Sequence, residues 1–168
     1  LAKTRIGYKN LMYLVSKSHF NSIDSVNTAF ISKDSLFDYS TGLILISGQY
    51  DDPIEQLFLK NRTKEAENLI LAFKENFPGD FFLELARTIP NFNKNYENFI
   101  LEQALKHDIP LVATNKTQFL DKHKIKSLDA LMCITSGRFL VENDREKAHS
   151  EHYLKNFIEM KNIFIDVP

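Results

Sequence analysis

The chain has 168 residues, of which 43% are hydrophobic, and its 21 basic and 22 acidic side chains give a formal net charge of −1. This length is typical of one domain with a packed core. The near-balance of charge argues against a stand-alone nucleic-acid-binding protein, which usually carries a basic surface. The single cysteine, Cys133, excludes a disulfide framework and favours a reducing, cytoplasmic location. No apolar run approaches the roughly 20 residues that span a bilayer, so we expect no membrane contact.

Two helices and a strand are expected in the first fifty residues. Residues 7–20 place apolar side chains at helical spacing along one stripe. Residues 32–40 predict a short helix that Ser32 caps. The apolar run 43–47, which follows Gly42, has the length of a buried strand.

The next two predicted elements are helices. Asp52 is a good N-cap residue and Pro53 suits the first helical position, so a helix is expected at 51–61. Residues 62–77 have apolar side chains at helical spacing and predict an amphipathic helix. Pro78-Gly79 ends it.

The second half of the chain continues the alternation of strands and helices. We expect a strand at 81–86, a helix at 93–108, a strand at 110–114 and helices at 127–137 and 150–162. Ser127 is the expected N-cap of the helix at 127–137, and Gly137 is expected to end it.

The alternation of strands and helices indicates βαβ units, with parallel strands and helices on the outside. Each strand is apolar on both faces, as expected for strands that are buried on both sides. The predicted fold class is therefore α/β.

Three parallel strands make a poor complete sheet, and a closed β/α barrel usually takes about 250 residues. The chain also begins at Leu1 in the middle of a pattern. We therefore expect residues 1–168 to be a single segment of a larger barrel, with its earlier strands upstream of Leu1.

Two positions near the ends of predicted strands are candidates for chemistry. Glu84 lies in an apolar strand, where a carboxylate can act as an acid or base. The alternative is a strand-end Glu that pairs with a neighbouring Lys or Arg. Ser47-Gly48 could approach a phosphate, although no glycine-rich nucleotide-binding loop is present.

The predicted last helix carries a pair of histidines. On a helix, His149 and His152 share a face and could hold a metal, with Glu146 as a third ligand. The spacing is not that of the HExxH zinc hydrolases. Two solvated histidines at a helix end are the favoured alternative.

Residues 116–126 form a basic stretch with Phe119 interleaved, which could contact phosphate. The alternative is a solvated loop, because a handful of lysines is a weak signal and Asp121 dilutes the charge. No G-x-S-x-G motif or other strong catalytic constellation occurs, so we expect no catalytic residue in this chain.

An ordered set of motifs nevertheless resembles one known family. The motifs are "GYKNLMYLVSKSHF", "GLILISG", "FPGDFFLELARTIP", "IPLVATNKTQFL" and "LDALMCITSG", followed by Ser150 and "YLKN". In this order and spacing they resemble the PHP domain of the alpha subunit of bacterial DNA polymerase III, over nearly the whole chain.

The resemblance implies the later part of a PHP-type (β/α)7 barrel, incomplete in this chain. It also implies that the parent protein is an enzyme, a DNA-directed DNA polymerase with nucleotidyltransferase activity. The magnesium-binding palm domain of such a parent would lie downstream. This segment itself is then expected to be non-catalytic and to contain no cofactor.

The resemblance further identifies three positions where metal-binding members of the family carry ligands. Thr88 stands where they have a His, and Lys116 and Gln118 stand where they have an Asp and a His. An ammonium among the ligands opposes cation binding. We therefore expect no metal here, and a structural domain that docks the proofreading exonuclease subunit.

The implied partners are that exonuclease subunit, the rest of the polymerase III holoenzyme, and DNA through the parent protein. Two alternatives remain open. One is a metal-dependent phosphoesterase or proofreading exonuclease whose ligands come mainly from upstream. The other is a small-ligand α/β binding domain unrelated to replication.

Overall fold

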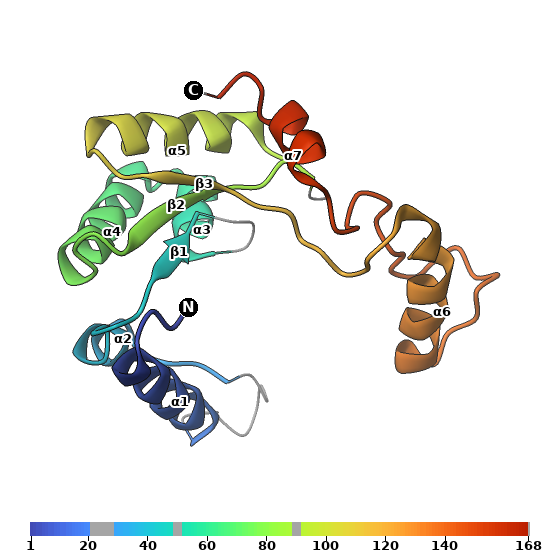
Figure 1. Cartoon of the computed structure of the whole chain (residues 1–168), viewed down its shortest axis with the longest axis horizontal. Coiled ribbons are helices and arrows are strands. Elements are labelled where there is room, and N and C mark those ends of the chain that lie inside the picture. Colours follow the sequence, from blue (N-terminus) through green and yellow to red (C-terminus); the bar gives the residue numbers. More distant parts are fainter. Residues whose placement is uncertain (21–28, 49–51, 89–91, 168) are drawn as a thin grey trace. The chain divides into compact units, whose positions relative to one another are not determined.

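The computed structural model describes residues 1–20, 29–48, 52–88 and 92–167 (Figure 1). The chain divides into two compact units, which are described separately. The first contains residues 1–84 and 96–112, and the second contains residues 85–95 and 113–168.

The sheet has three strands in the order β1-β2-β3, namely β1 (Leu45–Ser47), β2 (Phe81–Leu85) and β3 (Leu111–Ala113). Strands β1 and β2 are parallel, with Leu45 opposite Phe81. Strand β3 runs in the same direction as β2, because its hydrogen bonds advance along both strands together. The predicted α/β class and parallel pairing are therefore confirmed.

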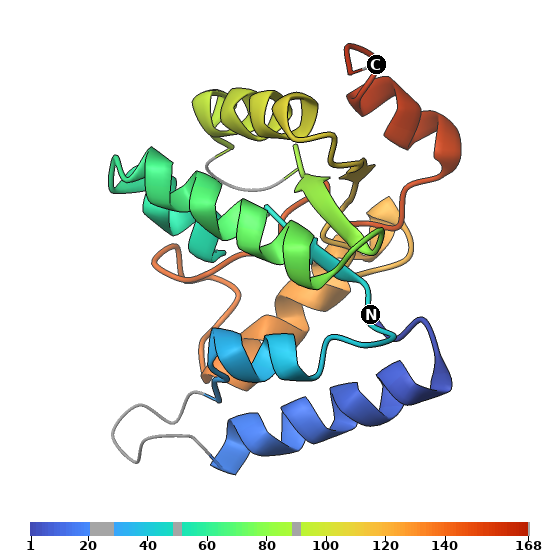
Figure 2. The ribbon, with the colours of Figure 1, turned by 90° about the vertical axis from the view of Figure 1, so that its left-hand side faces the viewer.

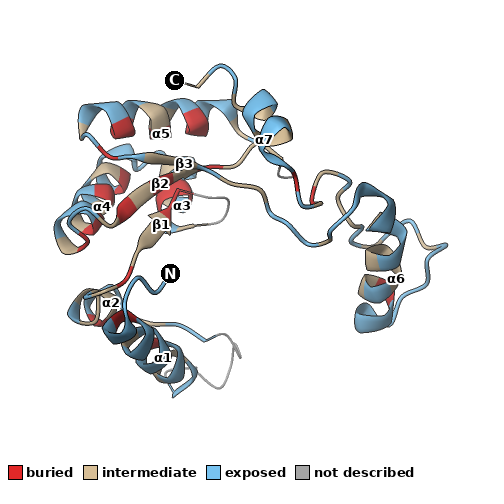
Figure 3. Ribbon diagram, viewed as in Figure 1, coloured by how far each residue is buried: buried red, intermediate tan, exposed pale blue. Residues whose placement is uncertain are grey.

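Three helices supply the core of the first unit around β2: α3 (Pro53–Leu59), α4 (Thr63–Asn76) and α5 (Lys94–Lys106). The largest fully buried side chains come from these helices and from β2; they are Ile54, Ile70, Leu83 and Ile100 (Figure 3). All three helices were expected at these places, although residue 51, the predicted start of the third helix, lies outside the described residues.

Burial along β2 alternates between buried and half-buried residues. Phe82 and Glu84 are half-buried because they lie on the face opposite to Phe81, Leu83 and Leu85. The expectation that each strand is buried on both faces is therefore wrong for β2. It is also wrong for β3, where Ala113 is exposed.

Helices α1 (Arg5–Phe20) and α2 (Lys33–Asp38) lie side by side (Figure 2). The rings of Tyr13 and Tyr39 stack with centroids 4.3 Å apart, and Lys17 Nζ donates to Ser35 Oγ over 2.9 Å. As predicted, Ser32 caps α2, since its side chain accepts from the Ser35 N–H.

Asp52 joins the end of β1 to the start of α3. Its Oδ1 accepts from the N–H groups of Ile54 and Glu55, both at 2.9 Å. Its Oδ2 accepts from Ser47 Oγ and from the Gly48 N–H, both at 2.6 Å. The predicted N-cap role is confirmed, and the same carboxylate also fixes the turn after β1.

The second unit contains the short 3-10 helix η1 (Lys122–Lys124) and helix α6 (Ile125–Ser136). Gly137 ends α6 with a φ of 65°, as predicted. The predicted start is wrong, because α6 begins two residues before Ser127. Its N-cap is Lys124, whose side chain makes no capping hydrogen bond.

The last predicted helix is only half correct, because α7 spans Phe157–Ile163 and residues 150–156 are not helical. Asn156 and Glu159 form a capping box, which starts the helix at 157. The residues before Asn156 bond instead to residues 115–119. None of the described helices is long and apolar enough to cross a membrane.

Candidate functional site

The carboxyl ends of β2 and β3 meet in the second unit, where the Thr114 N–H donates to the Leu85 carbonyl over 3.0 Å. Just beyond them, Thr88 Oγ1 donates to Asn115 Oδ1. Ligands of parallel α/β proteins bind outside the carboxyl ends of the strands. We call the region formed by Thr88 and residues 114–119 the strand-end corner.

A third segment, residues 149–156, lies against this corner, and we call it the strap. Phe119 and Tyr153 form an isolated parallel bridge. The Gln118 N–H donates to the His152 carbonyl over 2.7 Å, and the Leu154 N–H donates to the Phe119 carbonyl over 2.8 Å. Asn115 Nδ2 donates to the Tyr153 carbonyl over 2.7 Å.

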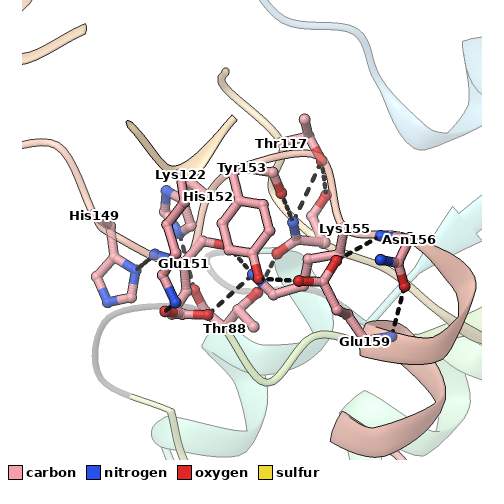
Figure 4. A network of polar contacts seen from close by, with 11 residues as sticks. Thr88, Thr117, Lys122, His149, Glu151, His152, Tyr153, Lys155, Asn156 and Glu159 are labelled. Carbon is pink, nitrogen blue, oxygen red and sulfur yellow. Dashed lines mark hydrogen bonds and ion pairs between the residues drawn. The ribbon is translucent and has the colours of Figure 1, made fainter. Parts of the chain in front are cut away.

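The His152 side chain links the strap to both segments of the corner, namely Thr88 and residues 114–119 (Figure 4). It is only 3% exposed. Its Nε2 lies 2.9 Å from the Thr88 carbonyl oxygen, and its Nδ1 lies 3.1 Å from the Gln118 side-chain amide. A carbonyl oxygen only accepts, so Nε2 carries the hydrogen. The Gln118 atom that faces Nδ1 is Oε1. In the neutral ring Nδ1 carries no hydrogen, so a hydrogen bond at this position requires the Gln118 amide to be turned with its NH2 group toward the ring.

The surroundings of His152 favour this neutral ring. Burial lowers the pKa of His152, and the positive charges of His149, Lys116 and Lys155 lower it further. The hydrogen bond to the Thr88 carbonyl opposes these effects. Because burial and neighbouring positive charges both disfavour the imidazolium form, protonation of His152 is costly in the folded protein.

The strap has an ion pair of its own, in which the lysine is buried and the glutamate is partly exposed. The Lys155 side chain is 2% exposed, and its Nζ lies 3.1 Å from Glu151 Oε2. It also donates to the Glu151 carbonyl over 2.5 Å and lies 3.7 Å from the centre of the Tyr153 ring. The ion pair and the cation–π contact both offset the desolvation of the ammonium.

Tyr153 connects the strap to α7. Its hydroxyl donates to Glu159 Oε1 over 2.6 Å, and Glu159 Oε2 accepts from the Asn156 N–H over 2.9 Å. The bond to the carboxylate and partial burial raise the pKa of Tyr153 to about 12. Glu159 therefore caps α7 and holds the strap with the same carboxylate (Figure 4).

The corner contains Thr88, Lys116 and Gln118, the three positions that the family resemblance identified with metal ligands. The His152 ring contacts the Thr88 carbonyl and the Gln118 side chain, and so it brings these two positions together. Lys116 is exposed, and its charge acts on His152. Within the described ranges, no group of three or more His, Cys, Asp and Glu side chains could hold a metal ion.

The proposed helical pairing of His149 and His152 is wrong, because both residues lie outside α7 in a turn. The His152 N–H donates to the His149 carbonyl over 3.1 Å, and the ring centroids are 4.7 Å apart. His152 is also not a solvated helix-end residue, because it is buried in the corner.

The other candidates lie in separate surroundings. Glu84 is half-buried on β2, and its charge contributes to raising the pKa of Tyr96, for which burial is the main cause. In the turn at Ser47-Gly48, the Ser47 hydroxyl and the Gly48 N–H both donate to the Asp52 carboxylate. This carboxylate occupies the place that an external anion would otherwise take. In the basic stretch, Lys122 pairs with Glu151 at 3.5 Å.

Sequence reasoning did not identify Asn115, Tyr153 or Lys155 as parts of the site. The bond from Asn115 to the Tyr153 carbonyl joins residues 38 positions apart in the chain. A single sequence contains no local pattern for such contacts. A Lys in a polar run is also usually exposed, so the burial of Lys155 was unforeseen.

Mild acid is expected to loosen the corner through His152. The folded-state pKa of this ring lies below the unfolded value of about 6.5, so the unfolded chain binds more protons. The contribution of His152 is then fully present above about pH 6.5 and is lost as the pH falls below it. Hydrogen exchange of residues 113–121 should be faster at pH 5.5 than at pH 7.5, after correction for intrinsic rates.

His152→Gln should remove this pH dependence, and His149→Ala should retain most of it because that ring makes no bond to the corner. An unchanged pH dependence in His152→Gln would show that another group is responsible.

Comparisons with known proteins cover the whole chain. It is 32% identical over 169 residues to the DNA polymerase III subunit alpha of Vibrio cholerae and 33% identical over 168 residues to that of Caulobacter vibrioides. It is 34% identical over 173 residues to the subunit alpha of Borreliella burgdorferi. The chain spans 14–15% of the length of these relatives.

A family model described as "PHP domain" matches residues 1–88, which is more than half of the 168 residues. The strands β1 and β2 and the helices α1 to α4 lie in this range. The chain therefore belongs to the PHP domain family.

Proposed function

We propose that this chain is a segment of the alpha subunit of a bacterial DNA polymerase III. The observation that carries the proposal is the similarity of the entire chain to proteins of that name in several bacteria. The parent protein would then be a cytoplasmic DNA-directed DNA polymerase and contact DNA. Its magnesium-dependent nucleotidyl transfer would take place in a palm domain outside this chain.

The proposed architecture is the later part of a PHP-type (β/α)7 barrel. The small parallel sheet with helices between its strands supports this architecture. Residues 1–168 would form one PHP-domain segment, and the remaining strands would come from upstream of Leu1.

Within the parent, we propose that the segment has a structural role and no chemistry of its own. Support comes from the contacts of the strand-end corner, where Thr88, Asn115 and Gln118 bond to the strap. Lys116 places a positive charge near the same corner, which opposes the binding of a metal cation. Catalytic residues, metal ligands and a cofactor are therefore not proposed for this segment.

The second part of the proposal is that the segment docks the proofreading exonuclease subunit. The resemblance to PHP domains of polymerase III supports this part. The test is a titration of the exonuclease subunit from the same organism against the full-length protein, with the intact PHP barrel as competitor. Docking predicts that the barrel alone displaces the full-length protein. Failure of the barrel to bind would exclude the docking role and leave the polymerase assignment intact.

A further inference from the structure

We propose that the strap is an intramolecular ligand of the strand-end corner, with His152 as its positioning residue. Another molecule could then reach the Thr88 carbonyl, the Asn115 side-chain amide and the Gln118 N–H only by displacing the strap. The inference uses contacts within the second unit and does not depend on the proposed function.

The strap occupies a place where a ligand would otherwise bind. Polar groups just beyond the ends of parallel strands commonly bind substrates or ions. Here three such groups face the strap instead. The Thr88 carbonyl accepts from His152 Nε2, Asn115 Nδ2 donates to the Tyr153 carbonyl, and the Gln118 N–H donates to the His152 carbonyl.

The strap also has a fixed shape of its own. Lys155 holds the turn at its start by bonding to the carbonyl and the carboxylate of Glu151. At its end, the Tyr153 hydroxyl and the Asn156 N–H share the carboxylate of Glu159. A segment fixed at both ends loses little conformational entropy when it binds the corner.

The residues that His152 links are far apart in the chain. His152 bonds to residues 64 and 34 positions away from it. The ring therefore closes two long loops with one buried side chain. Both bonds join His152 to segments that are distant in the chain, so they are tertiary contacts and not parts of a local turn.

The test compares His152→Ala with His149→Ala in the full-length protein by hydrogen exchange. His149 is a matched control, because its ring lies 4.7 Å from that of His152 but makes no bond to Thr88 or Gln118. We expect exchange in peptides covering 113–121 and 149–156 to accelerate about tenfold or more in His152→Ala, as loss of a buried hydrogen bond predicts. His149→Ala should exchange like the wild type in the peptide covering 113–121, and in 149–156 it should change only the Glu151 N–H, which donates to His149 Nδ1.

Wild-type exchange of both peptides in His152→Ala would overturn the proposal, and so would equal acceleration by the two variants. If His152→Ala accelerates exchange in α4 as well, the whole domain has unfolded, and Gln118→Met becomes the deciding variant. It keeps the side-chain length and removes the amide that faces Nδ1. Local acceleration in Gln118→Met supports the proposal, and wild-type exchange contradicts it. Neither readout involves polymerase activity or exonuclease binding.

Discussion

Replacing Gly7 with alanine is expected to destabilise the packing of α1 by about 3 kcal/mol, the upper end of the usual cost of overpacking. Gly7 is buried, and a Cβ added to it would overlap with the carbonyl carbon and oxygen of Gly42. Both opposing atoms belong to the backbone, so no side-chain rotation can relieve the clash. Gly42 cannot shift easily, because it has a φ of 74° and is packed against Thr4 and Gly7.

The measurement is the free energy of opening of residues 5–20, obtained from hydrogen exchange in the full-length protein. Gly79→Ala is the matched control. Gly79 has a φ of 76° with nothing within 4 Å of an added Cβ, so it tests backbone strain alone, which costs about 1–2 kcal/mol. If the loss of opening free energy in Gly7→Ala is no larger than the loss in Gly79→Ala, or does not appear in α1, the proposed packing is contradicted.

Replacing Asp52 with alanine is the second change for which we expect a large effect, a loss of about 2–4 kcal/mol. One carboxylate accepts four hydrogen bonds, two from the start of α3 and two from the turn after β1. Loss of an N-cap costs about 1 kcal/mol, and leaving the Gly48 N–H without its charged partner adds about 1–3 kcal/mol.

Ser32→Ala separates these two contributions, because Ser32 caps α2 but does not join that helix to a strand. Thermal unfolding should show a clearly larger loss for Asp52→Ala than for Ser32→Ala. Asp52→Asn should lie between them, because an amide offers only one acceptor oxygen to two pairs of donors. Equal losses in Asp52→Ala and Ser32→Ala would show that the bonds to Ser47 and Gly48 contribute little.

Local features of the structure were predictable from the sequence because their causes are local. Asp52 followed by Pro53 marks the start of α3, and Gly137 supplies the left-handed residue that ends α6. The alternation of apolar strands with helices predicted the parallel pairing of β1 and β2. Each of these predictions depends on residues a few positions apart or on a regular pattern.

The strap was not predictable in the same way. Residues 150–156 were expected to belong to a helix, yet the capping box of Asn156 and Glu159 begins the helix only at Phe157. The residues before it then bond to a loop more than 30 positions away. His152 was considered only as a helical metal ligand or, as the favoured alternative, a solvated helix-end residue, and both interpretations were wrong. Its observed role depends on tertiary contacts.

Two strand ends of this chain share one feature. After β1, the donors of Ser47 and Gly48 are taken by Asp52, and after β2 the Thr88 carbonyl is taken by His152. In both places the chain supplies its own partner where an α/β enzyme would bind a ligand. This chemistry supports the proposed structural role of the segment in a polymerase subunit.

The metal content of the purified full-length protein tests that role most directly. The protein would be prepared without chelators, dialysed against metal-free buffer and assayed for zinc and manganese. The structural role predicts well below about one equivalent of either metal, and the same content in Gln118→Met and His152→Ala. A retained content of about one equivalent or more, which falls in those variants, would contradict a metal-free corner.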